Sequence, residues 1–551
     1  MTGVLQLSLL FWRDIPLRLL SDSGEDRQRL MAPNKRNFII IAALLVIALA
    51  IAIASVPYRA RRAVEKYQAQ LLASGEKLNP EQLWPLSTPL ESNGAPLFRQ
   101  VMMLNWSGRT NILDKNAPVA MRMVAPGKAA VGWAQPNVHS NIDTNTWEEI
   151  EAALSRFDSY LDDVRLAAQR PVFDFGLDYR QGWSLLLPHL APLKRSVQFL
   201  TYASVCDLHR GDVMAACTNV ETALALVHAT STEPIPISQL VRLAMAQIAM
   251  TATWELMQAT NLTEAQLAAI QQDWSRLDFI KPSEQSLEFE RACSQMIITR
   301  MRNSSSQFRQ VLSLGSGGSA NGTPLPIQVG ERFLSEMVIA TRETRWRFSQ
   351  SYPDQLKALK GLQELLQTFR QVETNQSFVD AIRRQKGALD KLGLQLPEDD
   401  NFTWFDNGPD LSSLFSRSVL SLGRVCERVF NAEVARDLTT TALALKRYQL
   451  AHGDYPSDLS SLVPRFLPSI PRDPADGQPL RYRLKPDGTF LLYSIGLDGK
   501  DNGGDPSPAD GKTKSFSWLR GRDLVWPSPG APEGLAQTHP AGTADEPDRP
   551  L

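Results

Sequence analysis

Hydrophobic and polar positions divide the chain into an uninterrupted apolar run, a long region of helical periodicity and a short region of alternation. The run is Phe38–Val56, whose single polar member is Ser55. A helix of this length rises about 28 Å, close to the ~30 Å hydrocarbon core of a bilayer. A cleaved signal peptide is the alternative, but the run ends in Val56-Pro57 without a small-residue cleavage site. The pattern predicts an uncleaved transmembrane anchor.

The charges that flank this run leave its orientation open. Equal numbers of Lys and Arg lie close to its two ends, so the positive-inside rule favours neither side. The stretch that begins at Met31 resembles a natural protein start, and residues 1–30 are predicted to be a flexible extension. The anchor is placed at residues 31–57.

Helical periodicity then dominates residues 58–408, which we expect to form a large, mainly α-helical domain. Thr146 and Glu149 form a capping-box signature at the start of one such segment. Gly211-Asp212 is a turn between two further helical segments, 193–210 and 213–228. This helical hairpin is similar to one tetratricopeptide unit, but no second copy follows at a fixed period, so an ordinary bundle is the preferred interpretation. The apolar stripe after Thr146 contains Trp147, Ile150, Leu154, Phe157, Leu161 and Val164.

Composition changes at residues 394–409, where Pro, Asp, Asn and Gly concentrate, and a domain boundary is predicted there. A long helix over 411–452 follows. Two alternating segments, 480–484 and 489–493, flank Lys485-Pro-Asp-Gly488 and predict a β-hairpin. The second domain is placed at residues 409–527. Residues 528–551 are rich in Pro, Gly and Ala and are predicted to be a disordered tail.

The segment Ala442–Pro506 resembles the globular domain of the major pseudopilin of type II secretion systems. The shared features, in order, are a helix that ends at His452-Gly453, then Tyr455-Pro456, Pro471-Arg-Asp-Pro474, the hairpin, and Tyr493-Ser-Ile-Gly496. The resemblance implies a helix packed on a small antiparallel sheet, on the periplasmic side of a bacterial inner membrane.

The resemblance also implies a calcium site in the loop that follows the hairpin. The candidate metal ligands are Asp498, Asp501 and Asp505, separated by glycines. Calcium takes six to eight oxygen ligands, which short carboxylates and turn carbonyls can supply. The alternative is an Asp/Gly turn without metal, because these residues favour turns in any case.

The chain also departs from the pseudopilin pattern. The apolar run has neither the processed leader nor the early Glu of that family, and most of the chain separates it from the pseudopilin-like segment. We therefore expect an interaction module, and not a subunit that polymerises through its N-terminal helix.

Charge and motif content narrow the function classes. The net charge of −1 argues against a protein built to neutralise nucleic-acid phosphates. No HExxH, nucleophile elbow, P-loop or Rossmann glycine pattern is present, so no catalytic residues are predicted. Cys206 and Cys217 can be bridged across the helical hairpin, but two buried thiols are the preferred interpretation.

The sequence thus predicts an α+β protein with a single transmembrane helix, a helical domain and a small pseudopilin-like domain. The predicted location is the bacterial inner membrane, with the bulk of the chain in the periplasm. The predicted function is a structural or protein-interaction role among other envelope proteins, in association with a type II secretion or pilus-like system. The alternatives are a membrane-tethered helical protein that binds a ligand or peptide and, after it, an envelope hydrolase.

Overall fold

The computed structural model describes residues 35–102, 121–139, 144–315, 337–375, 377–395, 413–508 and 518–530. The chain divides into two compact units, Met1–Ala60 and Arg61–Leu551. The first described element is the helix α1, and all elements after it belong to the second unit.

The helix α1 (Lys35–Ala73) is continuous and contains Pro57. It does not end with the apolar run: charged residues follow in the same helix, and Val64 and Leu71 are buried beside Leu359. Across the described residues, no helix combines the length and the apolar character that a membrane crossing requires. The predicted anchor at 31–57 and the predicted single-pass inner-membrane location are therefore wrong.

Helices make up most of the second unit. The α-helices after α1 are α2 (Ala95–Met102), α4 (Trp147–Leu154), α5 (Asp158–Ala168), α6 (Leu190–His209), α7 (Val213–Ala229), α8 (Pro236–Met257), α9 (Glu264–Ser275), α10 (Ile280–Asn303), α11 (Ser305–Gly315), α13 (Ser351–Asn375), α14 (Phe378–Lys391), α15 (Leu414–Leu422) and α16 (Val425–His452). Short 3-10 turns are η1 (Pro80–Leu83), η2 (Leu90–Ser92), η3 (Ser155–Phe157), η4 (Tyr179–Ser184), η6 (Leu459–Leu462) and η7 (Trp518–Arg520), and η5 (Trp346–Gln350) is a π-helical turn.

Local signals explain several helix boundaries. Thr146 and Glu149 form the predicted capping box, in which each side chain accepts a hydrogen bond from the other residue's backbone N–H. At the start of α7 the side chain of Asp212 accepts a hydrogen bond from the backbone N–H of Ala215. Gly211, with a φ of 81°, makes the tight turn between α6 and α7. The predicted helical hairpin is confirmed.

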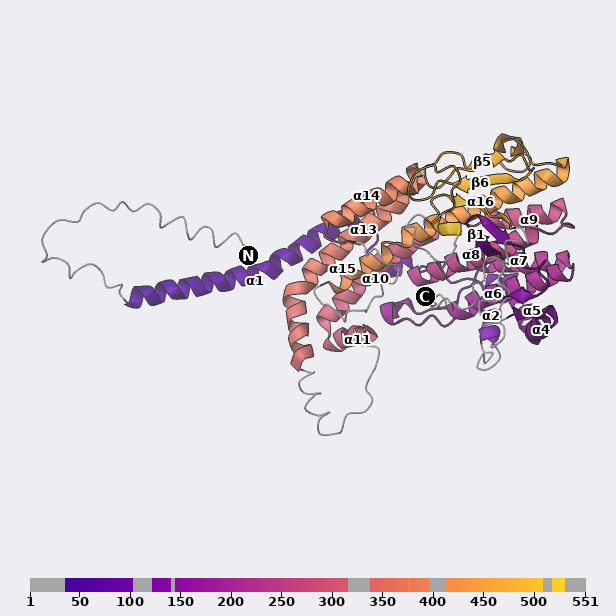
Figure 1. The fold of residues 1–551 in the computed structure, drawn as a ribbon. Helices are drawn as coiled ribbons and strands as arrows, with labels where there is room; N and C mark the ends of the chain where they lie inside the picture. The colour runs from indigo at the N-terminus through magenta and orange to yellow at the C-terminus, as the bar shows by residue number, and fades with distance from the viewer. Residues whose placement is uncertain are drawn as a thin grey trace, which may run out of the picture. The chain divides into compact units, whose positions relative to one another are not determined.

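The helices pack in two groups (Figure 1). In one, α6, α7 and α8 lie side by side, and α16 crosses to contact α8 and α9. In the other, α13 contacts α10, α14 and α15. The predicted long helix over 411–452 is divided into α15 and α16 at Gly423, which is the C-cap of α15.

Within the described residues, the strands are short and form three small sheets. β1 (Arg122–Ala125) pairs antiparallel with β2 (Lys128–Ala130), which pairs parallel with β8 (Ser528–Pro529). β3 (Val138–His139) pairs with β4 (Thr144–Asn145). β5 (Arg481–Leu484), β6 (Phe490–Ser494) and β7 (Leu524–Val525) form an antiparallel sheet, with Arg481 opposite Tyr493. The predicted β-hairpin is confirmed.

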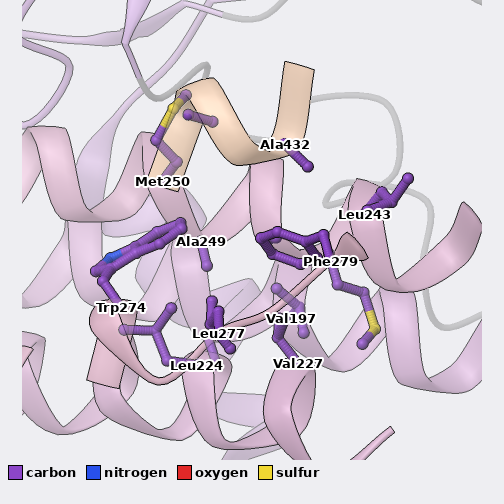
Figure 2. Packing of buried hydrophobic residues seen from close by; sticks show 14 of the residues in the cluster. Val197, Leu224, Val227, Leu243, Ala249, Met250, Trp274, Leu277, Phe279 and Ala432 are labelled. Atoms are coloured by element: carbon purple, nitrogen blue, oxygen red, sulfur yellow. The ribbon is translucent and has the colours of Figure 1, made fainter. Parts of the chain in front are cut away.

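A large hydrophobic core connects the two groups of helices with the C-terminal sheet. Figure 2 shows a part of it in which side chains of α6, α7, α8, α9 and α16 interdigitate around Trp274 and Phe279. Both rings are fully buried. Burying a large apolar side chain stabilises the fold by about 1.5–3 kcal/mol, so this shared core is a major source of stability.

The predicted α+β class is wrong, because the described chain is mainly helical with a small content of strand. The physical reason is the face that α16 buries. Its apolar residues, among them Val434, Leu438 and Leu445, are fully buried, and the helix packs against α8 and α9 as well as β6. The helix that resembles a pseudopilin helix therefore belongs to the common core. Most of the predicted boundary at 394–409 lies outside the described residues.

Candidate functional site

A cavity of about 350 Å³ lies between the α4–α5 segment and the α6–α7 hairpin. Ligand pockets of proteins have volumes from about 300 Å³ upward, so the cavity has room for a small ligand. One side is lined by Glu151, Leu154, Ser155, Asp158, Leu161 and Arg165, and the other by Ala203, Cys206, Asp207, Arg210, Ala215 and Thr218.

The lining is divided into an apolar floor and a polar rim. The side chains of Leu154, Leu161, Ala203 and Cys206 are buried, whereas Asp158 and other rim residues are exposed. This division follows from helix geometry, because residues three or four apart share one face of a helix. The cavity thus offers apolar contact at its base and charged groups at its opening.

A hydrogen-bonded network crosses the cavity wall. The buried carboxylate of Asp207 accepts hydrogen bonds from Arg210 and, at 2.8 Å, from the side-chain amide of Asn219. The amide oxygen of Asn219 accepts hydrogen bonds from Arg165, the nearer at 2.8 Å. Arg165 also lies 2.7 Å from Asp162. Both guanidinium groups of the lining are therefore bound by side chains of the same chain.

Burial controls the titration of Cys206 at the floor and of the neighbouring Asp207. It raises the pKa of Cys206 to about 12, and the charges of Glu151 and Asp207 raise it further. Burial also raises the pKa of Asp207, although its hydrogen bond with Arg210 opposes the shift. A thiol with so high a pKa stays protonated near neutral pH and is a poor nucleophile. The cavity floor is therefore suited to noncovalent contact with a ligand and not to covalent chemistry.

Two acids of the rim are not hydrogen-bonded to this network. Glu151 on α4 is half-buried and Asp158 at the start of α5 is exposed. Within the described part of the chain, neither carboxylate has a hydrogen bond or an ion pair through its side chain. Negative charge at the opening is thus left for solvent or a ligand to balance.

The sequence-predicted metal ligands lie in a separate place, the aspartate loop (Gly496–Asp505). Asp498 accepts a hydrogen bond from the N–H of Lys500 at 2.9 Å, and Asp501 accepts one from the hydroxyl of Tyr493 at 2.9 Å. Asp505 accepts one from the N–H of Ser507 at 3.0 Å. Each carboxylate thus closes a local turn or contacts the hairpin.

Among the described residues, no group of three or more His, Cys, Asp or Glu side chains is placed to hold a metal ion. In this arrangement Asp498, Asp501 and Asp505 do not form a common ligand set. Calcium binding by the loop stays a prediction.

Asp523 organises the aspartate loop, and sequence reasoning did not single it out. Its fully buried carboxylate accepts hydrogen bonds from the backbone N–H groups of Asn502 at 3.3 Å, Gly504 at 2.7 Å and Asp505 at 3.2 Å. The available signal was an acid directly before the apolar residues 524–526, because a carboxylate that is buried with such neighbours requires donors.

The cavity residues were also missed, although one signal was present. Asp207 stands among Val205, Cys206 and Leu208, which are all buried, and an acid in such a position needs a partner. The cysteines agree with the preferred interpretation: Cys206 and Cys217 are free and buried, as are Cys293 and Cys426. The hairpin carries no disulfide.

No family model, curated protein or solved structure matches this chain. The resemblance of Ala442–Pro506 to major pseudopilins, and an association with a type II secretion or pilus-like system, stay predictions.

Proposed function

We propose that this protein is a helical binding protein whose cavity between α4–α5 and α6–α7 takes a small polar ligand or one side chain of a peptide. The observation that carries the proposal is the cavity of about 350 Å³ with an apolar floor and charged residues at its opening. Binding sites for small ligands combine apolar walls with a few polar groups that fix orientation. This is the ligand- or peptide-binding function that the sequence left as an alternative.

Binding is favoured over catalysis by the state of the two buried titratable groups of the lining, Cys206 and Asp207. Cys206 is the thiol of the lining, and its pKa of about 12 leaves it protonated. Asp207 has both carboxylate oxygens engaged, by Arg210 and by Asn219. A general base must be within hydrogen-bond reach of a proton that it can take, and this acid already has two donors.

The proposal is tested by filling the cavity. Ala215 is half-buried in the lining, and Ala215→Trp places a large ring in the space of a ligand. Amino acids and dipeptides are added at high concentration, and the rise of the melting temperature is measured. A ligand at a hundred times its Kd stabilises the folded state by about 2.7 kcal/mol.

The matched control is Ala152→Trp, which adds the same ring at an exposed position of α4 that does not line the cavity. We expect some compounds to stabilise the wild type and Ala152→Trp but not Ala215→Trp. If every compound that stabilises the wild type stabilises Ala215→Trp equally, the cavity is not the binding site.

A further inference from the structure

We propose that the cavity selects ligands that carry a positively charged amino group, which Glu151 and Asp158 bind at the opening while the hydrocarbon part rests on the floor. This inference rests on the proposed function, since it names the class of ligand for the same site. Candidate ligands in this class are primary amines and peptides that present a lysine side chain.

The charges of the cavity lining favour a cationic ligand. The lining contains three carboxylates and two guanidinium groups. Both guanidiniums already have acidic partners: Arg210 is paired with Asp207, and Arg165 lies 2.7 Å from Asp162. The lining therefore carries more negative than positive charge, and the carboxylates of Glu151 and Asp158 are not in an ion pair with any described residue.

The electrostatic field inside the cavity has the same preference for a cation. Burial is the main reason for the high pKa of the Cys206 thiol, but the negative charges of Glu151 and Asp207 raise it further. Burial lowers the pKa of Arg210, yet Asp207 and Glu151 outweigh this effect and raise it. Glu151 therefore acts on groups at the floor and the rim, and a cation in the cavity is attracted by the same charge.

An anionic ligand faces the opposite situation. To bind Arg210 or Arg165 fully it must compete with Asp207 or with Asp162 and Asn219. Displacing Asp207 leaves a buried carboxylate without its charged partner, which is costly. A neutral ligand gains only apolar contact with the floor. A cationic head group adds charge-assisted hydrogen bonds to Glu151 and Asp158 without breaking an existing pair.

Three probes with four carbon atoms each test the inference: n-butylamine, butyrate and 1-butanol. Binding of each to the full chain is measured by ligand-observed NMR titration at pH 7. We expect n-butylamine to bind at least tenfold more tightly than butyrate or 1-butanol. In the double variant Glu151→Gln/Asp158→Asn, n-butylamine binding is expected to weaken at least tenfold.

Asp163→Asn is the matched control, because Asp163 lies on α5 but not in the lining. It is expected to leave n-butylamine binding unchanged, and circular dichroism checks that each variant is folded. If butyrate binds best and Ala215→Trp abolishes its binding, the amine inference is overturned while the proposed function stands. If Ala215→Trp weakens the binding of none of the probes and of no amino acid or dipeptide, both the amine inference and the proposed function are overturned. Equal weakening in Asp163→Asn also overturns the inference, because a general loss of negative charge then explains the effect.

Discussion

The carboxylate of Glu76 lies 2.8 Å from the guanidinium of Arg291, although 215 positions separate them in the chain. Arg291 is completely buried in α10, and Glu76 follows the end of α1. Arg370 and Gln363 of α13 donate to the same carboxylate. Within the second unit, Glu76 thus connects the segment after α1 with the helices α10 and α13.

Replacing Glu76 is expected to cost stability. Glu76→Gln leaves the buried Arg291 without its counter-charge, and breaking a buried pair in this way costs about 3–5 kcal/mol. The free energy of unfolding is measured by urea denaturation. Glu65→Gln is the control, because Glu65 is paired with Arg61 on an exposed face, where an ion pair contributes up to about 1 kcal/mol. Equal small effects of the two substitutions would contradict the prediction.

The Glu76 pair also predicts a loss of stability in acid. Burial by itself raises the pKa of Glu76, but hydrogen bonds from Arg370, Gln363 and Arg291 outweigh it and lower the pKa to about 2. A lowered pKa stabilises the folded state above the unfolded value of about 4.3, and this stabilisation is lost as the pH falls toward 2. The difference in unfolding free energy between wild type and Glu76→Gln should therefore shrink over this range. A difference that stays constant from pH 5 to pH 2 would exclude the mechanism.

Glu255 predicts the opposite pH dependence. Its fully buried carboxylate accepts hydrogen bonds from the backbone N–H groups of Met121 at 2.5 Å and Gly132 at 2.9 Å. Burial raises the pKa of Glu255 to about 7, and the backbone donors offset this only in part. A raised pKa of an acid means that the stabilisation is complete below about pH 4.3 and is lost as the pH rises through 7.

The measurement is the unfolding free energy of wild type and Glu255→Gln from pH 4.5 to pH 8. We expect the wild type to lose about 3 kcal/mol relative to the variant across this range, since each unit of pKa shift corresponds to about 1.4 kcal/mol. Parallel curves would mean that Glu255 does not titrate in this range.

Asp523 is expected to be the residue on which the aspartate loop depends. Asp523→Ala leaves the N–H groups of Asn502, Gly504 and Asp505 without their acceptor, and unsatisfied groups cost about 1–3 kcal/mol each where they stay buried. Hydrogen exchange of these three amides should become faster. Asp498→Ala is the control, because Asp498 is exposed and closes a local turn. Exchange that is equally fast in both variants would show that Asp523 has no special role.

Calcium binding is tested on the full chain, because the C-terminal part shares its core with the rest. If the aspartate loop binds calcium, the melting temperature is higher in calcium than in chelator, and Asp498→Ala removes the difference. By mass action the increment is about 2.7 kcal/mol at a hundred times the Kd. Identical melting curves in calcium and chelator would establish an Asp/Gly turn without metal.

Local features were predicted well, because their determinants lie within a few residues. Thr146 and Glu149 are three positions apart, and their capping box begins α4 as expected. Gly211-Asp212 joins α6 to α7, and Lys485–Gly488 joins β5 to β6. In each case the chain itself holds the interacting groups at short range.

The predictions that were wrong depend on features that extend beyond a short stretch of sequence. The apolar run Phe38–Val56 predicted a separate anchor, but hydropathy in a window does not show where a helix ends, and α1 continues to Ala73. The α+β class depended on treating the C-terminal segment as an independent module. Periodicity shows that α16 has an apolar face, but not that α8 and α9 cover it.

By itself, then, the sequence determined the helical caps, the turns and the apolar faces, since these follow from backbone preferences and side-chain spacing. Only the tertiary structure decided which distant groups meet: Asp207 with Asn219 beside the cavity, Glu76 with Arg291, and Asp523 with the aspartate loop. The reason is physical. A buried charge must find a partner, but any of several donors along the chain can satisfy that need, and the packing of the helices selects one of them.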